Sequence, residues 1–121
     1  MPSILIADDH IGLREAYEIL FIKEGFTVDM AEDGKEALQK ANAKTYDLIL
    51  LDMLMPNMSG IEFLRAFQPL QHPKTKVIVF SNVQAEEQIQ EAMTLGVKRY
   101  LTKAILPPKE MAAIVRGILQ Q

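Results

Sequence analysis

The chain has 121 residues, no cysteine and a formal net charge of -3. Its length fits one domain of ordinary size, and an apolar content of 49% is enough to build a single core. The negative charge gives no electrostatic footprint for DNA or RNA, so direct nucleic-acid binding is not expected. The lack of cysteine excludes disulfides, thiolate metal sites and cysteine nucleophiles. With no membrane-spanning stretch of roughly 20 apolar residues and no recognisable signal peptide, we expect a cytoplasmic protein.

Short runs of valine, isoleucine and leucine alternate with amphipathic segments along the chain. This alternation is typical of repeated units of one strand and one helix, whose strands form a parallel sheet. We predict five strands, at residues 3–7, 27–30, 47–51, 76–80 and 97–102. Since no linker, low-complexity segment or second pattern interrupts the series, residues 1–121 are expected to form one domain.

The first three helices carry recognisable end signals. The first is expected to end at Gly25, a natural left-handed cap, and to bury one apolar face: Leu13, Ala16, Tyr17, Leu20 and Phe21. The second opens with Asp33-Gly34-Lys35-Glu36 and the third with Ser59-Gly60-Ile61-Glu62. Both have the spacing of a capping box, in which the first side chain and the acid three residues later bond each other's backbone N–H groups.

The last two helices are expected to carry their apolar residues in a stripe along one face. A helix at residues 85–95 should end at Gly96 and bury Ala85, Ile89, Ala92 and Met93, which leaves Glu86, Glu87, Gln90 and Glu91 outside. Pro107 and Pro108 fit the first turn of a final helix, where a missing N–H costs little. Its apolar stripe consists of Met111, Ile114, Val115, Ile118 and Leu119.

Five polar residues fall at the ends of predicted strands: Asp8, Asp9, Asp52, Ser81 and Lys103. Parallel strands present their carboxyl ends at one edge of the sheet, where open α/β folds bind their ligands. Three carboxylates, a hydroxyl and an ammonium in one crevice suit a divalent cation beside a phosphoryl group.

Each of these residues has another explanation when it is taken alone. Asp8 and Asp9 have the position of helix caps, Ser81 that of a turn hydroxyl, and Lys103 that of a solvated charge. Asp52 looks less like a cap, because Met53-Leu54-Met55-Pro56 follows it in place of a helix. Their convergence on one edge of the sheet favours a functional site.

The residues at this edge match a known family in order and spacing. Asp8-Asp9, the segment from Leu51 to Gly60, Ser81, and the stretch from Gly96 to Lys103 resemble the response regulator receiver domain, the phosphoryl-accepting part of two-component signalling. The resemblance covers essentially the whole chain and indicates a chemotaxis-regulator-like single domain. It implies a flavodoxin-like (βα)5 three-layer sandwich, with a parallel five-stranded sheet of order 2-1-3-4-5.

The resemblance also implies a chemistry. Asp52 would accept a phosphoryl group from a histidine kinase or a phosphotransfer protein, and Ser81 and Lys103 would bind the phosphoryl oxygens. The implied ligands of Mg²⁺ are Asp9, Asp52 and the backbone carbonyl of Leu54, with Asp8 acting through a water. Such a chain is not an enzyme beyond self-phosphorylation and self-dephosphorylation. Leu54 and Val83 would flank the path of the attacking water, and because both are apolar we expect slow loss of phosphate.

The implied output is a change of surface. Ser81 and Tyr100 would act as a switch, although the pattern alone makes Tyr100 an ordinary edge-strand aromatic. The helix at 85–95, the strand at 97–102 with Ile105-Leu106, and the helix after Pro107 would form a face for a downstream protein partner. The chain would be a monomer or a weak phosphorylation-dependent dimer. Met1 and the lack of any tail favour a stand-alone regulator over an excised domain.

Two positions depart from the family pattern. Asn82 replaces the small residue usual after the hydroxyl, and Ala104 replaces the proline usual after the lysine. In the family the bond after the lysine is cis. A cis bond costs about 2.5 to 4 kcal/mol before a non-proline residue, against roughly 0.5 to 1 kcal/mol before proline, so we expect a trans bond between Lys103 and Ala104.

Two other functions stay open at this point. A Mg²⁺-dependent phosphohydrolase also uses an aspartyl nucleophile, but it usually needs a second acid close after that residue, where this chain has Leu54. A degenerate receiver would work as an interaction module without accepting phosphate. Retention of the five polar residues argues against the latter.

Overall fold

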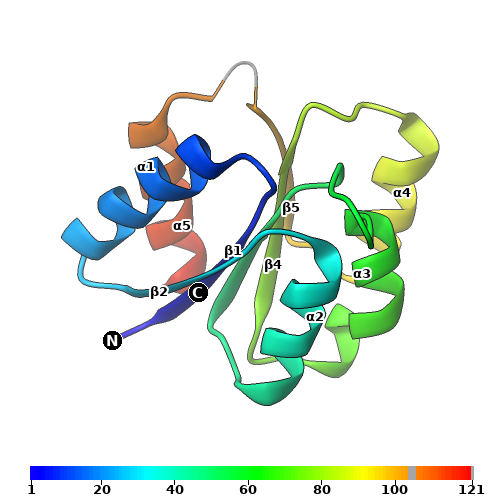
Figure 1. The fold of residues 1–121 in the computed structure, drawn as a ribbon, viewed down its shortest axis with the longest axis horizontal. Coiled ribbons are helices and arrows are strands. Elements are labelled where there is room, and N and C mark those ends of the chain that lie inside the picture. Colours follow the sequence, from blue (N-terminus) through cyan, green and yellow to red (C-terminus); the bar gives the residue numbers. More distant parts are fainter. Residues whose placement is uncertain (104–105, 121) are drawn as a thin grey trace.

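The computed structural model describes residues 1–103 and 106–120, in which five strands alternate with five α-helices (Figure 1). The strands are β1 Ser3–Ala7, β2 Thr27–Ala31, β3 Leu48–Leu51, β4 Lys76–Ser81 and β5 Arg99–Thr102. The helices are α1 Ile11–Lys23, α2 Gly34–Ala43, α3 Gly60–Phe67, α4 Glu86–Leu95 and α5 Pro108–Leu119, with a 3-10 turn, η1, at Pro69–Gln71. The bond between Lys103 and Ala104, and Ile105 of the expected partner face, lie outside the described residues.

All strand pairs are parallel, and their order is β2-β1-β3-β4-β5. This is the predicted flavodoxin-like fold, with α1 and α5 on one face of the sheet and α2, α3 and α4 on the other (Figure 1). Among the described residues no helix has the length and apolar character needed to cross a membrane.

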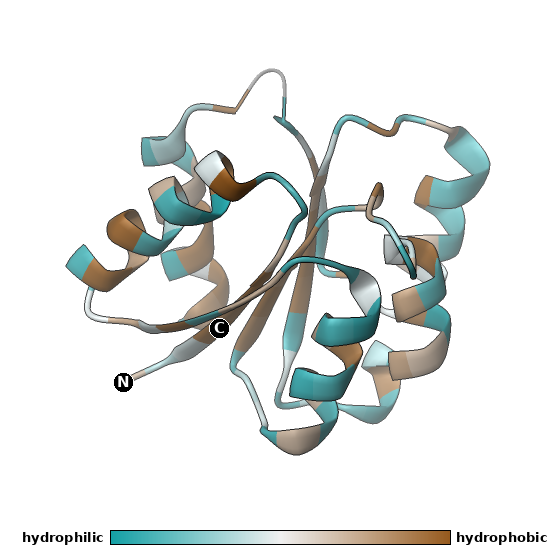
Figure 2. Cartoon of the chain, viewed as in Figure 1, coloured by the Kyte–Doolittle hydropathy of each residue, from teal (hydrophilic) through white to brown (hydrophobic). Residues whose placement is uncertain are grey.

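The central strands divide their side chains between two buried clusters. The cluster under α1 and α5 takes Ile4, Ile6, Leu48, Leu50, Ile78 and Phe80. The cluster under α2, α3 and α4 takes Leu5, Ala7, Ile49, Leu51, Val77 and Val79. Since successive side chains of a strand point to opposite faces, near-continuous apolar runs are what a sheet covered on both sides requires. Figure 2 shows largely brown strands between helices in which teal and brown residues are mixed.

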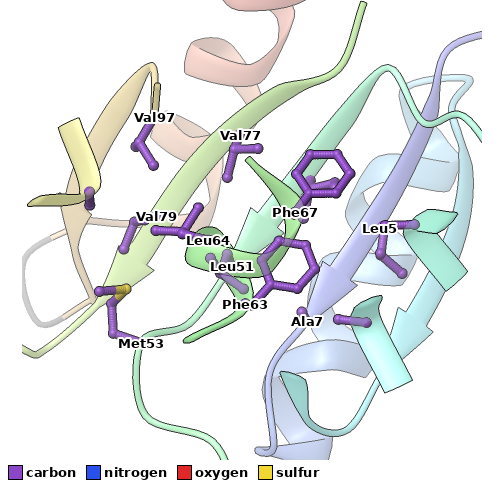
Figure 3. Close-up of a cluster of buried hydrophobic side chains, with 14 of the residues drawn as sticks. Leu5, Ala7, Leu51, Met53, Phe63, Leu64, Phe67, Val77, Val79 and Val97 are labelled. Atoms are coloured by element: carbon purple, nitrogen blue, oxygen red, sulfur yellow. The ribbon is translucent and has the colours of Figure 1, made fainter. Parts of the chain in front are cut away.

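Helix α3 anchors the second cluster. The rings of Phe63 and Phe67 stack with centroids 5.3 Å apart, and both are buried against the sheet near Leu5 and Val77 (Figure 3). Met53 lies in the same cluster directly after Asp52, so the segment that leaves β3 is packed into the core before it reaches the surface.

Two predicted helix faces were partly wrong. In α1, Ala16 is exposed, and the buried positions are Arg14, Tyr17 and Phe21. In α4, Ala85 and Met93 are exposed, and Ala92 is buried. The apolar pattern marked faces wider than the area that α1 and α4 bury against the sheet. The ends at Gly25 and Gly96 were predicted correctly, since both glycines have positive φ, at 91° and 112°.

The two predicted capping boxes differ. At α3, Ser59 accepts from the N–H of Glu62, and the Glu62 carboxylate accepts from the N–H of Ser59, as expected. At α2 only half of the box forms. Asp33 accepts from the N–H of Glu36 at 2.7 Å, but the Glu36 carboxylate accepts from the N–H of Glu32 instead. One oxygen of Asp33 remains available for another partner.

Tyr46 forms a hydrogen bond whose contribution to stability can be tested. It is buried, its hydroxyl donates to Asp29 Oδ2 at 2.6 Å, and this bond lowers the pKa of Asp29. Because the pKa is lowered in the folded state, the bond stabilises the fold above the ordinary carboxyl range and the stabilisation is lost as the pH falls through the folded pKa.

Tyr46→Phe should therefore lower the free energy of unfolding by about 1 kcal/mol at pH 7, a modest value because Asp29 is partly exposed. The deficit should shrink as the pH approaches 3. Urea denaturation at several pH values measures it, with Tyr46→Phe in an Asp29→Asn background as the control, where the deficit should be small at every pH. A deficit that stays constant between pH 7 and 3 would contradict the assigned contact.

Candidate functional site

The carboxyl edge of the sheet brings the predicted polar residues together. Asp8 follows β1 and Asp52 follows β3, and the pairing of Ala7 with Leu51 places the two acids side by side. Ser81 is the last residue of β4 and pairs with Thr102, after which Lys103 leaves β5. The strand register alone therefore aligns residues that are up to 95 positions apart in the sequence.

The ammonium of Lys103 lies between two buried carboxylates. Its Nζ is 2.6 Å from Asp8 Oδ2 and 3.0 Å from Asp52 Oδ2, and it lies 5.9 Å from the centroid of the Phe80 ring. Asp8 is 4% exposed and Asp52 6%, while the Lys103 side chain is 18% exposed. One cation thus compensates two carboxylates that have little contact with solvent.

The pKa values reflect this burial. Burial raises the pKa of Asp8, and the hydrogen bonds from Lys103 and from the N–H of His10 offset part of the increase. For Lys103, burial acts to lower the pKa, but the hydrogen bonds and charges of Asp8 and Asp52 outweigh it and the net pKa is raised. The lysine is therefore charged at neutral pH, whereas burial disfavours the charged form of Asp8.

Asp8, Asp9 and Asp52 place ligand oxygens within 4.8 Å of one another. Unlike the other two, Asp9 is exposed, so the cluster opens to solvent on its side. Carboxylate oxygens are the donors that Mg²⁺ prefers, and a small hydrated cation entering from the exposed side would offset charge that Lys103 alone does not balance. The donor set therefore fits Mg²⁺.

The segment after Asp52 is held close to the site. The N–H of Leu54 donates to Asp52 Oδ1 at 3.3 Å, while the Leu54 side chain is 65% exposed. The N–H of Gly60 donates to the carbonyl of Met53 at 3.0 Å. A Cβ on Gly60 would lie 2.4 Å from the Asp52 carbonyl oxygen, so only glycine permits α3 to begin this near the acid.

Ser81 and Tyr100 both contact the segment between β4 and α4. Ser81 is 1% exposed, and its Oγ accepts from the N–H of Val83 at 3.2 Å. The Tyr100 hydroxyl donates to the carbonyl of Val83 at 2.5 Å, and its ring packs against the buried cluster under α2, α3 and α4. Gln84 also bonds Thr102, at 3.3 Å. The loop is thus tied to β5 and to the hydroxyl at the site edge.

Sequence reasoning missed Arg14, which lies just beneath the acids. Its Nη1 donates to the backbone carbonyl of Asp8 at 2.6 Å, and the residue is 6% exposed. Its spacing of three and seven residues from Tyr17 and Phe21 puts it on the buried face of α1, and this spacing was the available signal. The apolar pattern gave no weight to a charged residue there.

Comparison with known proteins identifies the family. A family model described as the response regulator receiver domain matches residues 4–116. The chain belongs to this family. It is the receiver domain of a two-component response regulator, and receiver domains bind Mg²⁺ in an acidic pocket. The recognition made from the sequence motifs is confirmed.

Relatives with curated descriptions are longer than this receiver domain. Response regulator ArlR of Staphylococcus epidermidis is 31% identical over 121 residues, which are 100% of this chain and 54% of that protein. Transcriptional regulatory protein ResD of Bacillus subtilis is 30% identical over 119 residues, 98% of this chain and 48% of that protein. The chain spans about half the length of these relatives.

Solved receiver domains match almost the whole length of the chain. A CheY-like receiver domain protein from Methanospirillum hungatei superposes with a TM-score of 0.92 at 25% identity, covering 99% of this chain and 94% of that one. TrrA from Thermotoga maritima, solved in complex with Mg²⁺ and BeF, gives a TM-score of 0.83 at 28% identity, covering 98% and 99%.

The contact of Lys103 with two buried acids predicts a pH-dependent loss of stability in Lys103→Met. Without the ammonium, only the N–H of His10 still opposes the effect of burial on Asp8, so the folded-state pKa of Asp8 rises further and stability falls as the pH rises from the ordinary carboxyl range. We expect the variant to be less stable than the wild type by about 2 kcal/mol at pH 7 in the absence of metal, and by less at pH 4.5.

Urea denaturation in the presence of a chelator measures this difference. Lys98→Met, at an exposed lysine that follows α4, is the matched control and should change stability little at either pH. Equal stability of Lys103→Met and the wild type at pH 7 would show that the two carboxylates do not depend on the ammonium.

Proposed function

We propose that this receiver accepts a phosphoryl group on Asp52 in a Mg²⁺-dependent reaction. The donor would be the phosphohistidine of a histidine kinase or of a phosphotransfer protein, the partner that a two-component system implies. The observation that best supports the proposal is the position of Lys103, whose Nζ lies 3.0 Å from Asp52 Oδ2 and 2.6 Å from Asp8 Oδ2. In this arrangement a carboxylate oxygen can act as the nucleophile, and the ammonium beside it can bind the oxygens of the incoming phosphoryl group.

In this proposal an oxygen of Asp52 attacks phosphorus while the bond from phosphorus to the histidine nitrogen breaks, and the imidazole leaves with the electron pair. Lys103 and Ser81 bind phosphoryl oxygens of the resulting acyl phosphate. Asp9, Asp52 and the backbone carbonyl of Leu54 would hold Mg²⁺, with Asp8 acting through a water. When bound, Mg²⁺ supplies neutralisation of charge on the phosphoryl group. TrrA, a similar receiver solved in complex with Mg²⁺ and BeF, supports the proposal of a Mg²⁺-dependent site in this chain.

Output would begin at Ser81. Its Oγ now accepts from the N–H of Val83, so a bond to a phosphoryl oxygen would change the loop that Tyr100 also holds. A shift of this loop would alter the face formed by α4, β5 and α5. We propose this face as the site for a downstream protein partner or a weak phosphorylation-dependent dimer. It carries charges of both signs, with Glu86 and Glu87 in the first turn of α4, Lys98 just before β5 and Arg99 at its start.

The alternatives have less support. A phosphohydrolase would need a second acid near the nucleophile, and the side chain two residues after Asp52 is the exposed leucine Leu54. A degenerate interaction module would not need a lysine bonded to two buried acids, an arrangement that costs desolvation energy.

The direct test is incubation with Mg²⁺ and acetyl phosphate, followed by intact mass measurement. We expect a single phosphoryl adduct in the wild type, none in Asp52→Asn and none after chelation of Mg²⁺. Asp9→Ala should chiefly raise the Mg²⁺ concentration required, because it removes one proposed ligand.

Each alternative gives a different result. Continuous release of phosphate without an accumulating adduct would indicate a phosphohydrolase, and no reaction would indicate a degenerate module. An adduct that forms on Asp52→Asn at the wild-type rate would show that another side chain accepts the phosphoryl group.

A further prediction concerns the lifetime of the phosphorylated form. Leu54 and Val83 offer no side-chain donor or acceptor that could orient an attacking water, so we expect slow self-dephosphorylation. The double substitution Leu54→Asn and Val83→Glu should speed phosphate loss by about tenfold. Decay of the adduct, followed by mass after removal of acetyl phosphate, measures the rate. An unchanged or slower decay would count against a role for these two positions.

A further inference from the structure

The loop that follows β3 is fastened to the start of α2. Asn57 Nδ2 donates to Asp33 Oδ2 at 2.6 Å, and the N–H of Gly34 donates to the carbonyl of Met58 at 3.0 Å. These two bonds, which we call the Asp33–Asn57 clasp, join segments 24 residues apart in the sequence. Asp33 uses its other oxygen to cap α2, so one carboxylate serves both the helix and the loop.

Local geometry shows that the clasp is a built contact. A Cβ on Gly34 would lie 2.2 Å from the carbonyl oxygen of Met58, so only glycine allows the two backbones to approach this closely. Asn57 has φ 67°, in the left-handed region that asparagine tolerates better than most residues. Hydrogen bonds to the Asp33 carboxylate lower its pKa, the one from the Glu36 N–H most and the one from Asn57 next. The carboxylate is therefore charged when it accepts these bonds.

The clasp lies on the loop that contains Leu54. This loop is held at one end by the bond from Gly60 to the Met53 carbonyl, and near the other by the clasp at Asn57 and Met58. Between these points Leu54 donates to Asp52 Oδ1, and its carbonyl is the proposed third protein ligand of Mg²⁺. A carbonyl on an unfastened loop would sample several positions, and the metal would bind only the competent fraction.

We infer that Asp33 and Asn57 are positioning residues for the metal site, which act by holding the loop of residues 53–58 in its binding conformation. The inference rests on the proposed function, because it concerns the Mg²⁺ site assigned there. Neither residue would touch the metal. Their role is to raise the affinity for Mg²⁺ beyond what the three carboxylates provide.

The test is calorimetric titration of Mg²⁺ into the full chain. Asn57→Gly keeps a residue suited to positive φ and removes the amide, and we expect about fivefold weaker Mg²⁺ binding. Asp33→Ser keeps a capping hydroxyl but is too short to reach Asn57. Asp33→Asn keeps both a cap and an amide that Asn57 bonds after a flip of its own amide. Since both Asp33 variants lose the same charge, weaker binding by Asp33→Ser than by Asp33→Asn isolates the clasp from electrostatic attraction.

Two further measurements separate positioning from general stability. The double variant Asp33→Ser with Asn57→Gly should show a loss smaller than the product of the single losses, because both changes remove the same bond between Asn57 and Asp33. Asp47→Ser is a control at the far end of the sheet, where Asp47 accepts from the N–H of Ser3. It removes a comparable bond and should leave Mg²⁺ affinity unchanged, and thermal unfolding checks that all variants are folded.

Wild-type Mg²⁺ affinity in Asn57→Gly, with the wild type itself binding the ion, would overturn this inference and leave the proposed function standing. Equal affinities of Asp33→Ser and Asp33→Asn would overturn it as well. A wild type that binds no Mg²⁺ would overturn both the inference and the proposed site.

Discussion

The structure of the site depends on one interaction, the contact of the Lys103 ammonium with the carboxylates of Asp8 and Asp52. Two acids that are nearly excluded from water repel each other and lose hydration, so they need a cation within bonding distance. The lysine comes from the far end of the chain, 51 residues beyond Asp52. It reaches the acids because β4 lies between β3 and β5 in register, which makes the order of the sheet a condition for the charge balance.

The site consists of a buried part and an exposed part. The buried part, Asp8, Asp52 and Ser81, rests on strands that are covered on both faces, and these groups have little freedom to move. The exposed part consists of Asp9 and of loops whose own bonds hold them, such as Ser81 to Val83 and Asn57 to Asp33. The rigid buried part suits the nucleophile. The exposed part is accessible to an ion, and its loops can transmit a conformational change to α4 and β5. Helix α4 fits the second role because only Ala92 is buried among its described residues.

Features of the fold and the site that depend on local sequence patterns could be predicted, whereas those that depend on contacts between separate segments could not. Strand positions and the convergence of the five polar residues came from local apolar runs and parallel pairing, and the strand order came from the family resemblance. The unequal burial of Asp8 and Asp9, which are neighbours in the sequence, could not be read from their identity. The spacing of Arg14 from Tyr17 put it on the buried face of α1, but Arg14 was missed because an apolar pattern gives no weight to a charged residue. The contact of Asn57 with Asp33 joins two loops and leaves no periodic signal. The exposure of Ala85 and Met93 depends on how little of α4 the sheet covers.

Lys103 and Ser81 are proposed to bind the oxygens of a phosphoryl group on Asp52. A crystal structure of this chain with Mg²⁺ and beryllofluoride, a phosphoryl mimic, would show whether they do. We expect beryllium bonded to a carboxylate oxygen of Asp52, fluorine atoms within bonding distance of Lys103 Nζ and Ser81 Oγ, and the metal on Asp9 and Asp52. An adduct elsewhere, or an Asp52 adduct with Lys103 still bonded only to Asp8 and Ser81 still bonded to Val83, would contradict this proposal.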